Sequence, residues 1–307
     1  MLSRVADAVF WMARYMERTD NVLRVLRTNY IASQDEIQNF DWQLWADGLG
    51  ARVKGDKVSV THYREALFQL VLNKENDTSV LINIVRAREN ARSVQDYITK
   101  EVWQCINDYY HLIQDKHTER LMLESDPVTA IDNLQRESVL FYGSVDVTMS
   151  RGEGYTFLNI GKYIERPLRS LDILELKMLE MERGGNEAMH WKYLLYSLSG
   201  YEFHSKQYKN TLLMDDVIHQ VFMNTQFPHS VLYSLQQVER YFKRLDAISL
   251  PEHFKEMEFL IGKAISNLKY GMNPHANAEE IKALIIKTRS EIKAVAHKLA
   301  TLYFGYS

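Results

Sequence analysis

Apolar side chains recur along the first forty residues at alternating steps of three and four, which is the spacing of one helix face. The positions in this series are Val5, Val9, Met12, Met16, Thr19, Leu23, Leu26 and Tyr30. A second stripe beside it contains Trp11, Tyr15, Val22 and Val25. A helix with two adjacent apolar faces is covered on more than one side. We therefore expect residues 1–39 to form a central helix of a bundle.

A second segment repeats this pattern in the middle of the chain. Its apolar series is Phe157, Ile160, Ile164, Pro167, Leu171, Leu174 and Met178. Both segments carry Tyr-x-Glu-Arg, first in "RYMERTDN" and 148 residues later in "KYIERPLR". Two related polar motifs thus fall within two helices whose surroundings are predicted to be apolar.

The rest of the chain also reads as helices joined by short turns. Asp126 before Pro127 and Asn186 after "RGG" are predicted N-caps, and Asn277 with Glu280 has the spacing of a capping box. The further predicted helices cover about 62–73, 79 to 110 or beyond with one break, 127 onward, 187–207, 211–224, a segment ending near Asp246, 251–271 and 278–304. The Trp-rich connector 40–58 is expected to cap the bundle; the alternative is an exposed patch that binds a partner.

The repeat extends beyond the Glu-Arg motifs. Ser-Val-Leu occurs at Ser79 and again at Ser230, an offset of 151 residues. We infer an internal duplication with halves at about 1–147 and 148–307. No flexible linker separates them, and the period is far longer than the 20–50 residues of a solenoid. The predicted fold is all-α: a helical bundle forming one large domain, 1–307, from two pseudo-symmetric halves.

Composition supports this fold class and narrows the function. Apolar residues make up 46% of the 307 residues, whereas only 13 Gly and 5 Pro punctuate them, too few breakers for a chain rich in turns. A net charge of −3 gives no general attraction to nucleic acid. No stretch approaches the ~20 apolar residues of a membrane span, and no signal peptide is evident, so we expect a cytoplasmic protein. A single cysteine, Cys105, excludes an intrachain disulfide.

The charges of the motifs need partners from elsewhere in the fold. Neighbours such as Glu17 and Arg18 diverge by about 100° around a helix. Arg14 is spaced to contact Glu17, whereas Arg18 needs a partner from another helix. We expect that partner in the segment "RARENAR", whose polar residues are Arg86, Arg88, Glu89, Asn90 and Arg92. In the second motif, Pro167 follows Arg166 and is expected to kink the helix there.

Two interpretations of these polar sites stay open. In the first, the networks fix the register between helices, since stranding one member of a buried ion pair costs roughly 3–5 kcal/mol. In the second, they line a site for an anionic or zwitterionic ligand or for a partner protein. The candidate binding residues are Arg14, Tyr15, Glu17, Arg18, Arg88, Glu89, Asn90, Arg92, Tyr163, Glu165, Arg166 and Ser230.

The sequence names no catalytic residue and predicts no cofactor or metal. Di-iron bundles require Glu and Glu-x-x-His elements on successive helices. The chain offers one Glu-x-x-His, Glu187 with His190, and two Asp-x-x-His analogues ending at His219 and His111. These fall short of the required set, so we expect the histidines to serve at the surface or as caps.

Several motifs together resemble the bacterial alpha-E domain family, which is named for its helices and Glu-Arg motif. They are "MLSRVADAVFWMARYMERTDNVLRVL", "SVLINIVRARENARSV", "EVWQCIN", "GEGYTFLNIGKYIERPLRSLDIL" and "FPHSVLYSL". The resemblance runs from residue 1 to at least residue 240. Departures are Ala13 where Gly is common, Pro167, and His229 where Arg is expected; the last removes a fixed charge from any anion site at that position.

The resemblance implies a context more than an activity. Members of the family are typically encoded beside, or fused to, a circularly permuted ATP-grasp protein similar to carboxylate–amine ligases. Transglutaminase-like peptidases are frequent neighbours. The resemblance thus implies a non-catalytic helical subunit or binding module of an ATP-grasp ligase system for peptide synthesis or modification. The alternative is an independent enzyme acting on a small amino-bearing substrate, with Glu17 or Glu165 as general base, which requires an accessible carboxylate of raised pKa.

Overall fold

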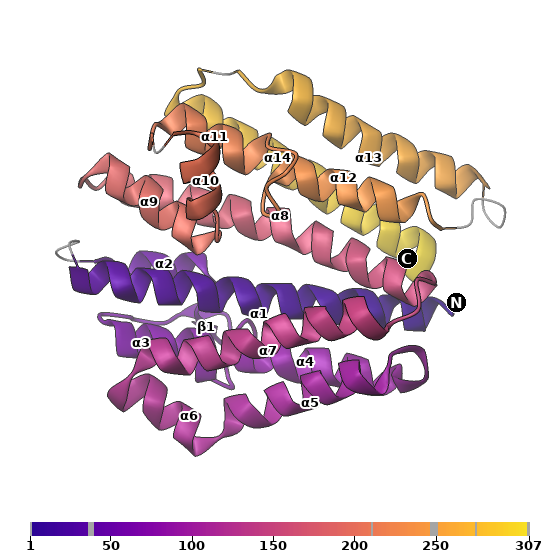
Figure 1. Cartoon of the computed structure of the whole chain (residues 1–307), viewed down its shortest axis with the longest axis horizontal. Helices are drawn as coiled ribbons and strands as arrows, with labels where there is room; N and C mark the ends of the chain where they lie inside the picture. The colour runs from indigo at the N-terminus through magenta and orange to yellow at the C-terminus, as the bar shows by residue number, and fades with distance from the viewer. Residues whose placement is uncertain (1, 36–39, 210, 246–250, 274, 306–307) are drawn as a thin grey trace.

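The two helices with Glu-Arg motifs lie side by side at the centre of the molecule and run in the same direction (Figure 1). The computed structural model describes residues 2–35, 40–209, 211–245, 251–273 and 275–305. The first central helix, α1, spans Ser3–Asp35, and the second, α8, spans Glu153–Met181. They are the two longest helices in the described part of the chain.

The elements between α1 and α8 pack on the α1 side of this pair (Figure 1). They are α2 (Trp42–Gly48), β1 (Arg52–Val53), β2 (Asp56–Lys57), α3 (Tyr63–Leu67), the π-helical turn η1 (Phe68–Leu72), α4 (Val80–Ser93), the 3-10 turn η2 (Gln95–Tyr97), α5 (Lys100–Gln114), α6 (Lys116–Arg120), the π-helical turn η3 (Leu121–Ser125) and α7 (Pro127–Thr148). Among these, α4 and α7 pack directly on α1.

The elements after α8 cover its other side (Figure 1). They are α9 (Glu187–Ser197), α10 (Tyr201–Gln207), α11 (Met214–Phe222), α12 (Val231–Phe242), α13 (Pro251–Gly271), α14 (Ala278–Leu299) and the π-helical turn η4 (Ala300–Phe304). The last of these returns to the start of α1, where Phe304 contacts Phe10 and Phe157 at ring-centroid distances of 5.1 and 5.8 Å. One continuous apolar core joins both sides of the central pair.

The predicted helical fold is confirmed, since the only strands in the described residues form one two-stranded hairpin. The predicted caps are confirmed as well: Asp126 and Asn186 accept hydrogen bonds from the first turns of α7 and α9, and Asn277 forms the capping box of α14. Ser79 and Ser230 cap α4 and α12 in the same way. These features agree with two related halves, but the duplication itself stays a prediction.

Of three local predictions, one was wrong and two are confirmed. The helix expected over 187–207 is broken after α9, where Ser199 adopts a left-handed φ of +51°. The helix expected from residue 79 to 110 or beyond is interrupted between Ser93 and Lys100 and continues to Gln114, as predicted. The connector contains α2, whose Trp42 and Trp45 are buried against the bundle, so it caps the fold and is not an exposed patch.

The predicted helix ends near residue 39 and Asp246 lie outside the described residues. Within the described residues, no helix combines the length and the apolar character needed to cross a membrane.

Candidate functional site

Glu17 of α1 is buried and bound by the arginine of the other motif. Arg166 of α8 donates from Nε and Nη2 to the two carboxylate oxygens at 2.6 and 3.1 Å. The hydroxyl of Tyr142, from α7, donates to Oε2 at 2.7 Å. Only 2% of Glu17 is exposed. A bidentate charged pair of this geometry is among the strongest hydrogen-bonded contacts that side chains make.

Glu165 of α8 is fully buried and is bound by three arginines. Arg18 of α1 donates from Nε at 2.5 Å, and Arg14 of α1 donates from Nε at 2.7 Å. Arg169, one turn further along α8, lies 3.2 Å away and also pairs with Asp172 at 3.0 Å. Glu165 therefore has three arginine partners, whereas Glu17 has one arginine and one tyrosine hydroxyl.

The two motifs thus exchange partners across the α1–α8 interface. Each glutamate binds the arginine of the other helix, because neighbouring residues on one helix point in different directions. The prediction that Arg18 takes its partner from another helix is confirmed, but the expected helix was wrong: the partner is Glu165 of α8. The contact expected between Arg14 and Glu17 is replaced by the contact between Arg14 and Glu165.

These arginines keep both glutamates ionised. Burial raises the pKa of Glu17. The charge and hydrogen bonds of Arg166 lower this pKa by more than burial raises it, so the pKa lies below its ordinary value of 4.5. At Glu165 burial again raises the pKa, and Arg14, Arg18 and Arg169 together bring it far below 4.5. Both carboxylates are charge-paired acceptors in a dry interior.

Pro167 does not break the second motif. α8 continues through Arg166 and Pro167; the expected kink at this point stays a prediction. Arg166 is held by Glu17 of α1 and by packing against Tyr163 of its own helix, which supports the helix where Pro removes one backbone hydrogen bond. The prediction that the two sites differ is consistent with the unequal number of arginines at the two glutamates.

The two motif tyrosines are packing residues. Tyr15 lies against Trp11 and under the Arg18 guanidinium. Tyr163 is buried and stacks on Tyr241 of α12 at a centroid distance of 5.9 Å.

The segment "RARENAR" on α4 lies outside these pairs. Arg88 donates to Asn107 of α5 at 3.0 Å and lies over the ring of Tyr110. Glu89 is exposed and lies within 3.7 Å of Arg88 and Arg92. Arg86 pairs with Asp77. Asn90 has a local role, since its carbonyl accepts from Ser93. The candidate Ser230, outside this segment, is buried and caps α12.

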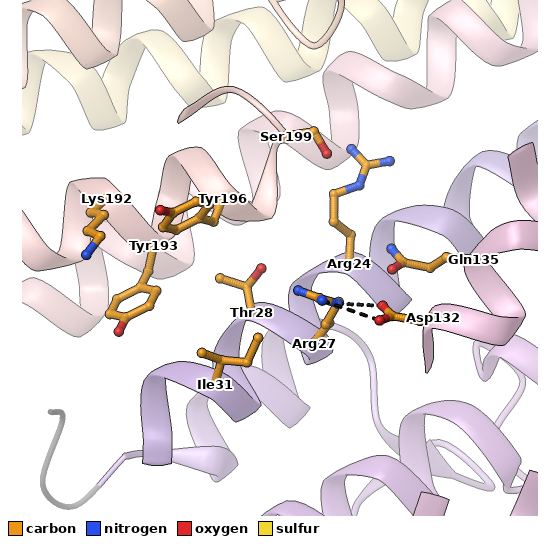
Figure 2. Close-up of a pocket in the computed structure, with 10 residues that line it drawn as sticks. All are labelled: Arg24, Arg27, Thr28, Ile31, Asp132, Gln135, Lys192, Tyr193, Tyr196 and Ser199. Carbon is orange, nitrogen blue, oxygen red and sulfur yellow. Dashed lines mark hydrogen bonds and ion pairs between the residues drawn. The ribbon is translucent and has the colours of Figure 1, made fainter. Parts of the chain in front are cut away.

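A pocket of about 500 Å³ opens two turns beyond Glu17, between α1, α7 and α9 (Figure 2). Its lining residues are Arg24, Arg27, Thr28, Ile31, Asp132, Gln135, Lys192, Tyr193, Tyr196 and Ser199. None of them was a predicted site residue. Arg24 nevertheless follows Glu17 by seven residues, and Thr28 and Ile31 follow at steps of four and three, so the face of α1 that carries Glu17 continues into the pocket.

Arg24 lines the pocket and is held in place by two neighbouring side chains. It forms an ion pair with Asp20, and its Nη1 donates to Nε2 of His229 at 2.8 Å. Because arginine is only a donor, that nitrogen of His229 must be an unprotonated acceptor. Burial, followed by the charges of Arg24 and Arg166, holds the pKa of His229 well below 6.5. His229 is thus a neutral ligand of Arg24 and adds no fixed charge.

The family of the chain is identified by a match over nearly its whole length. A family model described as "a predicted alpha-helical domain with a conserved ER motif" matches residues 1–304. The chain belongs to the Alpha-E family. Uncharacterized proteins of Mycobacterium bovis and of two strains of Mycobacterium tuberculosis are 22% identical to it over 273 residues. The match covers 80% of this Alpha-E chain but only 30% of those relatives. No solved structure matches it.

Sequence reasoning missed several members of the Alpha-E site. Arg169 had a detectable signal, since it follows Glu165 by four residues. Tyr142 had none, because it reaches Glu17 only through tertiary packing. His229 stood out only as the departure from an expected Arg, and its contact with Arg24 also depends on tertiary packing. No group of three or more His, Cys, Asp or Glu side chains in the described parts of the chain is arranged to hold a metal ion.

Proposed function

We propose that this Alpha-E chain is a non-catalytic helical subunit or binding module of an ATP-grasp ligase system for peptide synthesis or modification. The observation that carries the proposal is the reciprocal pairing of the two Glu-Arg motifs. Their charges are used to hold α1 and α8 together, which suits a rigid module that presents surfaces to a partner. The ligase would activate a carboxylate, and this chain would hold the ligase, the acceptor, or both.

The alternative, an independent enzyme with Glu17 or Glu165 as general base, lacks its required geometry. A general base needs an accessible group with a pKa near the working pH. Glu17 is 2% exposed and Glu165 is 0% exposed, and the pKa of each is lowered. Each would have to leave its arginines before it could accept a proton from a substrate.

The greater length of the mycobacterial relatives supports the proposal of a binding module. The chain spans about 30% of their length, so in them the Alpha-E segment is joined to a larger amount of other sequence. A module that is covalently joined to another unit in some proteins is a natural binding subunit in others. The proposed partner is a circularly permuted ATP-grasp protein, with a transglutaminase-like peptidase in the same pathway. Their ATP-dependent chemistry would place the module in the cytoplasm.

The test is reconstitution with the ATP-grasp protein encoded nearest in the same genome. The two purified chains are mixed, and complex formation is measured by light scattering after size exclusion and by calorimetry. ATP consumption is then followed for each chain alone and for the mixture. We expect a stable complex and ATP turnover that depends on the ATP-grasp protein. An ATP-grasp protein from an unrelated pathway is the control and should not bind.

Two results would contradict the proposal. One is product formation by the Alpha-E chain alone. The other is the absence of any complex with the cognate ATP-grasp protein at concentrations near 100 μM, roughly the upper limit for a weak specific interface.

A further inference from the structure

The pocket between α1, α7 and α9 has an excess of positive charge. Its walls carry three cations, Arg24, Arg27 and Lys192, and one anion, Asp132. Arg27 and Asp132 neutralise each other through contacts of 2.5 and 3.4 Å (Figure 2). Arg24 is paired with Asp20, which does not line the pocket, so Arg24 and Lys192 are the two wall cations without a carboxylate partner in the wall itself.

These two cations differ in how they are held. Arg24 has a side chain only 13% exposed and is fixed by Asp20 and His229. Its side chain reaches toward Ser199 in Figure 2. Lys192 is half-buried on α9, and in the described part of the chain no carboxylate lies within ion-pair distance of it. A half-buried ammonium without a carboxylate is a ready partner for an external anion.

The remaining walls suit an apolar body with some polar contacts. Ile31 of α1 and the rings of Tyr193 and Tyr196 lie between the Arg24 end and the Lys192 end (Figure 2). Thr28 and Gln135 add neutral groups that can hydrogen-bond. A volume of about 500 Å³ is typical of a small-molecule site.

The rim of the pocket also stores backbone strain. Ser199 adopts a φ of +51°, a conformation that costs a non-glycine residue on the order of 1–3 kcal/mol and that clusters at binding sites. The break after α9 places this serine at the Arg24 end of the pocket (Figure 2).

We propose that this pocket binds a small organic acid, with its acid group at Arg24 and Ser199 and its apolar body along Ile31 and Tyr193. Lys192 adds a second positive charge at the opposite end. The shared chemistry is an anionic head on an apolar body, which a carboxylate or a phosphate ester could supply. The site belongs to this chain alone, so it does not depend on the ligase partner.

The test uses the purified full chain and ligand-detected NMR titrations of three probes. N-acetyl-L-phenylalanine and phenyl phosphate represent the two acids, and N-acetyl-L-phenylalaninamide is the uncharged control. We expect saturable binding of at least one acid, with a Kd of about 1 mM or tighter, and binding of the amide at least tenfold weaker. The stronger of the two acids identifies the head group.

Variants locate the binding. Arg24→Gln should abolish it, and Lys192→Met should weaken it about threefold, whereas the matched control Lys206→Met, on α10 outside the pocket walls, should leave it unchanged. If Arg24→Gln fails to fold, Ile31→Trp, which fills the apolar part of the pocket, takes its place and should weaken binding at least tenfold. Equal binding of acid and amide, no saturation at about 10 mM acid, or equal effects of the two lysine variants would overturn the proposal.

Discussion

At the scale of single residues, the central helix pair is held by the buried carboxylates of Glu17 and Glu165, each paired with arginine. Glu165 accepts from Arg14 and Arg18 of another helix, and Glu17 accepts from Arg166. The geometry of one helix was enough to predict that Arg18 must find its partner elsewhere. Which helix supplies it was not predictable, because periodicity identifies the faces of a helix but not the faces they meet.

Glu165 should make stability depend on pH in the acidic range. Its pKa is lower in the folded state than the ordinary 4.5, so the unfolded chain takes up protons first as the pH falls. The stabilisation from Glu165 is therefore complete above about pH 5 and is lost progressively as the pH drops below 4.5 toward the folded pKa. We expect Glu165→Gln to lower the free energy of unfolding at pH 7 by roughly 3–5 kcal/mol and to flatten its decline below pH 5.

Urea titrations at several pH values measure both effects. Glu89→Gln is the control, because Glu89 is 55% exposed in its side chain and exposed ion pairs contribute little; it should follow the parent chain. An unchanged pH dependence in Glu165→Gln would show that Glu165 is not held as an ionised group.

At the scale of elements, local capping chemistry predicted where three of the helices start. Asp126, Asn186 and Asn277 were identified as caps, and all three act as caps. The failures had tertiary causes. The turn at Ser199 uses a left-handed φ that serine rarely adopts, and α2 forms where the buried Trp42 and Trp45 pack on the bundle.

Gly161 should be required for the close approach of α1 and α8. A Cβ at this position would lie 2.4 Å from the carbonyl oxygen of Phe10, and a backbone atom in a packed helix cannot move aside cheaply. We expect Gly161→Ala to destabilise the protein by about 1–3 kcal/mol through overpacking. Gly143→Ala on α7 is the matched control: its Cβ would meet nothing within 4 Å.

The control should act in the opposite direction. Replacing an exposed helical glycine by alanine stabilises by about 0.5–1 kcal/mol. Thermal unfolding of the two variants compares them directly. Equal melting temperatures for both would mean that α1 and α8 are not in close backbone contact at Gly161.

At the scale of the whole molecule, α1 and α8 form a central pair with helices on both sides (Figure 1). Scarce Gly and Pro and the apolar periodicity predicted the helical class and the two central helices. They did not predict that the two Glu-Arg motifs meet each other, nor that the Glu17 face of α1 extends into a pocket. Both depend on contacts between segments more than 100 residues apart, which one sequence does not specify.

The most direct test of the reciprocal pairing between the two Glu-Arg motifs is a pair of double-mutant cycles on the free energy of unfolding. One cycle combines Glu17→Gln with Arg166→Met, and the other combines Glu17→Gln with Arg18→Met. Reciprocal pairing of the two motifs predicts a coupling of about 1.5 kcal/mol or more for Glu17 with Arg166, which touch across the helices at 2.6 Å, and less than about 0.5 kcal/mol for Glu17 with Arg18. Equal coupling in the two cycles, or stronger coupling between the sequence neighbours, would contradict it.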